Sequence, residues 1–212
     1  MPLIVIEGID GVGKTTLAQN IVARLRAGGV QRVSYLKFPD LSSNSGAQIA
    51  QMLSGKCSLN MNRLYELNVE NRRAYADVLA AAAQSADDYI ICDRYLYSGI
   101  AYSNIEDITW GFQREAHLPY PTVLIYMRGT QRLADRARLD MVERTAYHHV
   151  IDAKFANIFD TYRGILMLSL RRAETNIYTL WSDTRGNHRF AVVYNLEPPE
   201  VILDNIMNIV IG

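Results

Sequence analysis

The segment 8–15, GIDGVGKT, most constrains what this chain can fold into, because it matches the phosphate-binding pattern G-x-x-x-x-G-K-[ST]. The apolar run Leu3–Ile6 precedes it, and apolar residues at helical spacing follow it from Leu17 to Leu25. A strand–loop–helix unit is therefore predicted. Its glycines would let backbone N–H groups surround a phosphate, and the helix N-terminus would attract the anion. A glycine-rich turn that only caps a structural helix is the alternative interpretation.

The side chains of this segment point to a nucleoside triphosphate as the ligand. Lys14 is expected to reach the β- and γ-phosphates of ATP, and the Thr15 hydroxyl is expected to hold Mg²⁺. The residues expected to bind ATP are Gly8, Asp10, Gly11, Val12, Gly13, Lys14, Thr15 and Thr16.

Strand-like and helical runs alternate along the rest of the chain, which predicts a doubly wound α/β fold. The expected strands are Leu3–Ile6, Val33–Phe38, Tyr89–Cys92, Val123–Met127 and Phe190–Tyr194, giving a five-stranded parallel sheet with helices on both faces. The expected helices cover about 14–27, 45–54, 59–85, 131–137, 146–172 and 198–210. Segment 174–189 breaks the alternation and is predicted to form a hairpin.

Length and composition favour a single domain, 1–212, that carries a lid at about 129–147. Lys plus Arg and Asp plus Glu both number 22, so the balance of charge does not favour a nucleic-acid polymer as partner. Cys57 and Cys92 form neither a disulfide framework nor a metal-ligand spacing. Apolar runs stay below the ~18 residues that span a bilayer. A soluble protein in the cytoplasm, without a membrane partner, is expected.

A second polar segment follows the third predicted strand. Asp93 would lie at that strand's carboxyl end, opposite the phosphate loop, where it could hold Mg²⁺ through water. Arg94 could bind a second phosphate with both arms of its guanidinium. Phe38 and Pro39, which end the second strand, could form a wall of a base or sugar pocket. A surface Asp–Arg pair and an ordinary turn are the alternative interpretations.

The basic stretch after the fourth strand allows two interpretations. It contains the arginines 128, 132, 136, 138 and 144, with acidic residues between them. Mixed charges at this spacing are typical of exposed helices that form ion pairs along their surface. The alternative is a lid that closes over ATP and supplies arginines to the phosphoryl group in transfer.

Taken together, these motifs resemble the thymidylate kinase family of nucleoside monophosphate kinases. The matching blocks are IEGIDGVGKTT at 6–16, FP at 38–39, NR at 71–72, DRY at 93–95 with SG at 98–99 and Tyr102, and LPYP at 118–121. The resemblance implies the P-loop kinase fold with a small helical lid. It also implies transfer of a phosphoryl group from ATP to dTMP with Mg²⁺, in a homodimer that serves dTTP synthesis.

Residue roles follow from the same resemblance. Asp10 would bind the sugar 3′-hydroxyl, and Arg94 would bind the dTMP phosphate. Arg72 would donate to a thymine carbonyl, and Tyr102 would stand against the 2′ carbon. The other residues implied to line the substrate are Phe38, Pro39, Asn68, Ser98 and Gly99. The residues implied to act in catalysis are Lys14, Arg94, Arg136 and Arg138.

The chain departs from the family pattern at three informative positions. Leu41 stands where eukaryote-like members carry a phosphate-binding arginine, and Asn68 stands where a phenylalanine often stacks on thymine. Gly11 stands where some members carry a catalytic arginine, so the resemblance implies that Arg136 or Arg138 of the lid supplies that charge. Loss of the aromatic face predicts looser selection of the base.

Two other functions are less consistent with the sequence. A deoxynucleoside kinase, acting on a 5′-hydroxyl, needs a carboxylate base and usually has a Glu-Arg-Ser block; this chain has Asp93-Arg94-Tyr95. A GTP-dependent switch needs an Asn-Lys-x-Asp motif, which the sequence lacks.

Overall fold

The computed structural model describes residues 3–85, 88–128, 148–166, 168–172, 178–185, 187–194 and 198–211. The predicted lid at 129–147 lies outside the described residues, and so do the two arginines, Arg136 and Arg138, that the family resemblance implies for catalysis.

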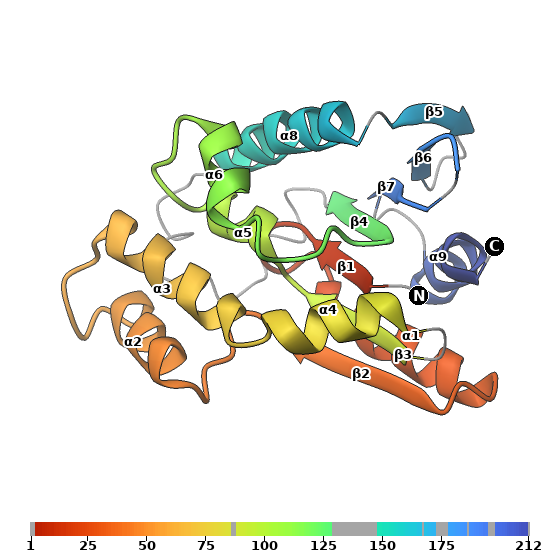
Figure 1. Cartoon of the computed structure of the whole chain (residues 1–212), viewed down its shortest axis with the longest axis horizontal. Helices are drawn as coiled ribbons and strands as arrows, with labels where there is room; N and C mark the ends of the chain where they lie inside the picture. The colour runs from red at the N-terminus through yellow and green to blue at the C-terminus, as the bar shows by residue number, and fades with distance from the viewer. Residues whose placement is uncertain are drawn as a thin grey trace.

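A seven-stranded sheet with the order β2-β3-β1-β4-β7-β6-β5 forms the centre of the fold (Figure 1). The strands are β1 Leu3–Glu7, β2 Arg32–Lys37, β3 Asp88–Asp93, β4 Val123–Arg128, β5 Ser169–Arg172, β6 Tyr178–Ser182 and β7 Arg189–Tyr194. The first five strands in this order pair in parallel, which confirms the predicted five-stranded parallel sheet. The sheet is wider than predicted, because β6 and β5 extend it by antiparallel pairing.

Segment 169–172 was predicted as the end of a helix, and that prediction is wrong. It forms β5, which pairs with β6, while β6 pairs with β7 across the segment for which the sequence suggested a hairpin. Pairing with a neighbouring strand satisfies the backbone of this segment, and such tertiary context outweighs local helical spacing.

Helices connect the strands. They are α1 Lys14–Ala27, α2 Asn44–Leu53, α3 Met61–Arg73, α4 Ala76–Gln84, α5 Leu96–Ala101, α6 Ile108–Arg114, α8 His148–Ile165 and α9 Pro199–Ile211. The predicted helix 59–85 is divided at residues 74–75 into α3 and α4. The short helices α5 and α6 were not predicted, since six or seven residues are too few to show a helical period.

The two faces of the sheet carry different helices. Strand residues paired in parallel share a face, and side chains alternate along each strand. Ile6 and its partner Asp93 lie on the face of α1, because Thr15 at the start of α1 contacts Asp93. Glu7 lies on the opposite face, where it contacts α5. The carboxylates of Asp93 and Glu7 therefore point to opposite sides of the sheet.

Apolar packing holds both layers in place. Phe155, Phe159 and Tyr162 of α8 pack against rings on β4 and β7, with Phe159 and Phe190 ring centroids 4.9 Å apart. On the other face α1 contacts α9. Cys92 is buried in β3, as predicted.

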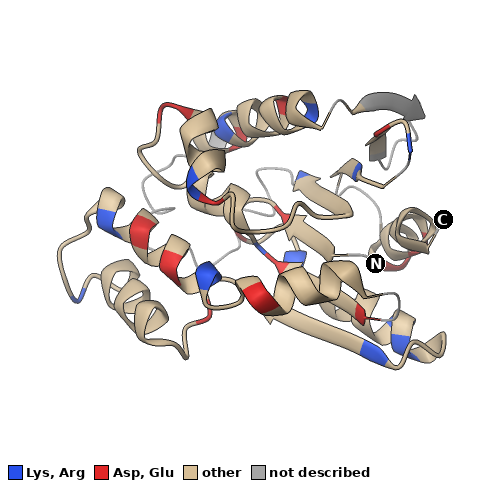
Figure 2. Ribbon diagram, in the orientation of Figure 1, with Lys and Arg blue, Asp and Glu red and all other residues tan. Residues whose placement is uncertain are grey.

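Both signs of charge occur along α3. In Figure 2, blue residues lie toward the two ends of this helix and red residues lie between them. Every helix among the described residues falls short of the length and apolar character that crossing a membrane requires.

Candidate active site

The phosphate loop connects β1 to α1 and lies at the carboxyl edge of the parallel strands, where ligands of such folds bind. Gly11 and Gly13 have φ of 81° and 90°, a region that favours glycine. Gly8 approaches β4 so closely that an added Cβ would lie 2.5 Å from the carbonyl oxygen of Met127. Gly8 and Gly13, the two glycines that the phosphate-binding pattern requires, therefore have backbone reasons to be glycine.

Lys14 is buried at the base of the loop. Its Nζ donates to the carbonyl oxygen of Ile9 at 2.6 Å and lies 3.5 Å from Oδ1 of Asp10. Burial, together with the charge of Arg94, lowers the pKa of Lys14 to about 8, while Asp10 and Asp93 act in the opposite direction. An anion that binds beside this desolvated ammonium would therefore stabilise its charge.

Thr15 and Asp93, the two predicted metal ligands, lie together. The Thr15 hydroxyl donates to Oδ2 of Asp93 at 2.5 Å, and the Tyr35 hydroxyl donates to the same oxygen at 3.2 Å. Oδ1 of Asp93 is buried and accepts no hydrogen bond from the described residues. Burial and the Asp93 charge raise the pKa of Tyr35 to about 12, so this phenol stays a donor.

This arrangement fits a Mg²⁺ ion that shares its coordination with phosphate. An unpaired buried carboxylate oxygen beside a hydroxyl supplies oxygen ligands of the kind Mg²⁺ prefers. Within the described ranges, no three His, Cys, Asp or Glu side chains gather as a metal cluster. Phosphate oxygens and water would therefore complete the coordination.

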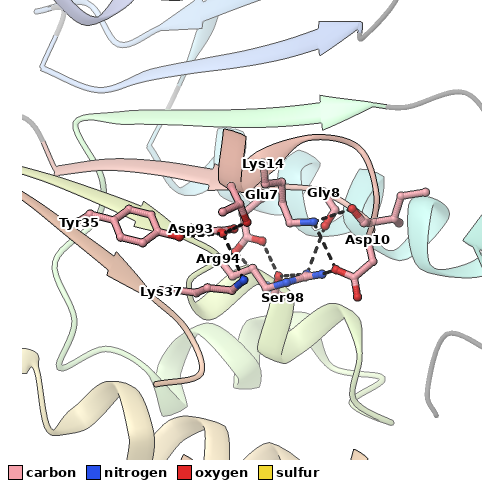
Figure 3. A network of polar contacts seen from close by, with 11 residues as sticks. Glu7, Gly8, Asp10, Lys14, Tyr35, Lys37, Asp93, Arg94 and Ser98 are labelled. Atoms are coloured by element: carbon pink, nitrogen blue, oxygen red, sulfur yellow. Dashed lines mark hydrogen bonds and ion pairs between the residues drawn. The ribbon is translucent and has the colours of Figure 1, made fainter. Parts of the chain in front are cut away.

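Arg94 joins the phosphate loop to the second polar segment (Figure 3). Its Nη1 donates to the carbonyl oxygen of Gly8 at 3.2 Å and to Oγ of Ser98 at 2.9 Å, and its Nη2 donates to Asp10. The guanidinium also lies over the ring of Tyr102, 5.3 Å from its centroid. Arg94 has a φ of 70°, the one positive value at a non-glycine residue in the described chain. A strained backbone of this kind is typical of functional positions.

Glu7 is a residue of this site that sequence reasoning missed. It is fully buried, and its carboxylate accepts from the backbone N–H of Tyr95 at 2.8 Å and from N–H and Oγ of Ser98 at 3.1 and 2.5 Å. Burial raises the pKa of Glu7, while the bond from Ser98 and the charge of Arg94 lower it. The carboxylate fixes the start of α5 beneath Arg94, and only the fold brings these segments together.

A cavity extends from Arg94 between α2, α3 and α5. It is lined by Asp10, Phe38, Pro39, Ile49, Leu53, Leu64, Tyr65, Asn68, Arg72, Arg94, Tyr95, Ser98, Gly99, Tyr102 and Ser103. This set contains every residue that the sequence suggested for substrate binding. Apolar walls with a few polar groups are typical of small-molecule sites.

Arg72 provides a buried cation at the wall of this cavity. It forms an ion pair with Glu115, which follows α6, and both side chains are at most 1% exposed. A Cβ added at Gly99 would lie 2.5 Å from Nη2 of Arg72, so the glycine leaves space for the guanidinium. The ion pair of Arg72 with Glu115 could not be found from the sequence, because Glu115 lies 43 positions away from Arg72.

At Asn68 the cavity wall carries an amide in place of an aromatic ring. Asn68 donates from Nδ2 to the carbonyl oxygen of Leu64 at 2.8 Å, which turns the amide toward its own helix. Tyr65, which also lines the cavity, packs against Trp110 with ring centroids 6.0 Å apart. Sequence reasoning missed Tyr65 as a wall of the site.

The chain is similar to known proteins in both sequence and structure. The profile of the thymidylate kinase family matches residues 6–177. A putative thymidylate kinase 251L of Invertebrate iridescent virus 6 is 34% identical over 137 residues, 63% of this chain and 63% of that protein. Human thymidylate kinase is 28% identical over 139 residues, 64% of each chain. The matched part thus spans less than two thirds of these two relatives.

Two solved structures share the fold over nearly the whole chain. The thymidylate kinase from Candida albicans has a TM-score of 0.62 and 21% identity, covering 99% of this chain and 90% of that one. The thymidylate kinase from Ehrlichia chaffeensis has a TM-score of 0.64 and 16% identity, with coverage of 99% and 97%.

Proposed function

The chain belongs to the thymidylate kinase family, and from that premise we propose that it transfers the γ-phosphoryl group of ATP to dTMP, giving dTDP. The observation that carries the proposal is the position of Arg94. Its guanidinium contacts the phosphate loop through Gly8 and Asp10 and also lines the apolar cavity. A cation at that junction suits an acceptor whose phosphate faces the loop and whose base enters the cavity.

The donor side of the reaction depends on the loop. Backbone N–H groups of 11–16 and the Lys14 ammonium would bind the β- and γ-phosphates. Because Lys14 is buried, its interaction with the growing charge of the transition state would be stronger than in water. Mg²⁺, held by Thr15 and through water by Asp93, would neutralise phosphate charge when bound.

The acceptor side depends on the cavity. Arg94 would bind the 5′-phosphate of dTMP, and Asp10, already beside Arg94, would accept from the sugar 3′-hydroxyl. Arg72 would donate to a carbonyl of the base, while Tyr102 would crowd the 2′ position. Since Gly11 has no side chain, Arg136 or Arg138 would supply the remaining positive charge, as the family resemblance implies.

Three finer features of the proposal rest on family resemblance. They are Mg²⁺ as the ion, a homodimer as the assembly, and a cytoplasmic role in the synthesis of dTTP.

A deoxynucleoside kinase remains the alternative. Such an enzyme needs a carboxylate that can take a proton from the 5′-hydroxyl. The Asp10 carboxylate forms ion pairs with Lys14 and Arg94. Both contacts hold it against the cations proposed to bind phosphate, which favours the monophosphate as acceptor.

A coupled assay with ATP and Mg²⁺ tests the proposal directly. The acceptors are dTMP, dUMP, dGMP and thymidine, each supplied alone at the same concentration. We expect turnover of dTMP and none of thymidine. Phosphorylation of thymidine in preference to dTMP would establish the alternative, and no turnover of dTMP would refute the proposal.

A further inference from the structure

The end of β2 places a lysine at the mouth of the phosphate site. Lys37 is the last residue of β2, and its Nζ lies 3.8 Å from Oδ2 of Asp93. Its side chain is 57% exposed. Figure 3 shows Lys37 beside Asp93 and Arg94, with Asp10 on the far side of the Arg94 guanidinium.

Lys37 shares a hollow with residues of both nucleotide sites. The hollow is lined by Asp10, Gly11, Gly13, Lys14, Thr15, Thr16, Lys37, Phe38, Pro39, Leu41, Leu53, Asp93 and Arg94. Five of these residues, namely Asp10, Phe38, Pro39, Leu53 and Arg94, also line the apolar cavity. Lys37 directly precedes two of them, so its charge is on the acceptor side of the loop.

The other cations of the hollow are held more firmly. Lys14 is buried and donates to a loop carbonyl, while Arg94 contacts Gly8, Asp10 and Ser98. Lys37 has a long ion pair to Asp93 and a mostly exposed stem, so it can move to a ligand at low cost. Leu41, on the rim of the same hollow, is apolar and 54% exposed.

We propose that Lys37 binds the 5′-phosphate of the acceptor nucleotide, together with Arg94. The inference rests on the proposed function, because it assumes a monophosphate in the apolar cavity. A phosphate that approaches Arg94 also approaches the Asp93 carboxylate, and like charges repel. An ammonium 3.8 Å from Asp93 offsets that repulsion and adds a donor where Leu41 gives none.

Binding measured without turnover tests this inference apart from catalysis. Calorimetry in EDTA, without ATP, would compare dTMP with thymidine, which has the same base and sugar but no phosphate. For Lys37→Ala we expect about tenfold weaker binding of dTMP, the size of one charge-assisted contact, and unchanged binding of thymidine. Lys37→Arg should retain most of the dTMP affinity.

Two further variants test whether the effect depends on a cation at this position. Arg32→Ala removes a basic residue at the opposite end of β2, where Arg32 pairs with Asp88 at 2.5 Å, and should leave dTMP binding unchanged. Adding Leu41→Arg to Lys37→Ala should restore part of the dTMP affinity, because it returns a cation to the same hollow.

Several outcomes would overturn the inference. They are wild-type affinity for dTMP in Lys37→Ala, equal losses for dTMP and thymidine, or a Lys37→Arg variant as weak as Lys37→Ala. If the wild-type protein still turns over dTMP, the proposed function stands and only the inference about Lys37 fails, since that function does not require Lys37.

Discussion

Replacing Glu115 by Gln would remove the charge that compensates Arg72 inside the protein. Both side chains are at most 1% exposed, so water cannot take over the role of the lost carboxylate. Breaking a buried pair from one side costs about 3–5 kcal/mol, because an uncompensated charge stays behind. Gln keeps the volume and one acceptor oxygen, so we expect the lower value, about 3 kcal/mol. For a domain of this length that lowers Tm by about 6–12 °C.

The chain offers a matched control one residue away. Arg114 pairs with Glu66 at 2.7 Å, but both side chains are about two fifths exposed (40% and 39%). Water screens an exposed pair and weakens its contribution to stability, so Arg114→Ala should change Tm little.

Calorimetric unfolding of the two variants and the wild-type protein measures this difference, and dTMP kinetics give a second reading. If Arg72 holds the base, Glu115→Gln should raise KM for dTMP more than it lowers kcat. A Tm loss no larger than that of Arg114→Ala would show that burial does not make the Arg72–Glu115 pair important, and the reasoning would be wrong.

Three further predictions follow from the site. Because the pKa of Lys14 in the free protein is about 8, ATP affinity should fall as pH rises from about 7 to about 9.5. The Lys14→Met variant should bind ATP weakly and without that pH dependence. If calorimetry showed the same pH dependence of ATP affinity in this variant as in the wild-type protein, Lys14 would be excluded as its source. Gly99→Ala should raise KM for dTMP at least about tenfold, because its Cβ displaces the Arg72 guanidinium; an unchanged KM in the coupled assay would mean that Arg72 does not contact the base. Asn68→Phe should lower KM for dTMP and reduce activity on dUMP and dGMP, since a phenyl ring gains up to about 1.5 kcal/mol by stacking; strict dTMP specificity in the unaltered protein would contradict this.

Local sequence was sufficient to predict the phosphate loop and the parallel strands. The loop needs particular residues at fixed spacing, since glycine alone tolerates φ values such as 90° at Gly13, and the flanking periods specify strand and helix. Asp93 and Arg94 were found for the same reason, because in a doubly wound sheet the residues that follow a strand face the ligand.

Contacts between distant segments could not be predicted from the sequence. Nothing near Arg72 indicates that Glu115 neutralises it, and nothing near Arg94 indicates that Glu7 holds the helix beneath it. Segment 169–172 has helical spacing yet becomes a strand, because β6 offers its backbone partners.

The sequence by itself therefore identified candidate groups for binding phosphate, metal and base. Only the tertiary structure decided how those groups are charged, oriented and supported. The physical reason is that burial sets the strength of electrostatic interactions, and burial depends on neighbours that the fold supplies. Lys37 illustrates the difference: in the sequence it is one basic residue among 22, and in the structure its ammonium lies 3.8 Å from Asp93 at the mouth of the phosphate site.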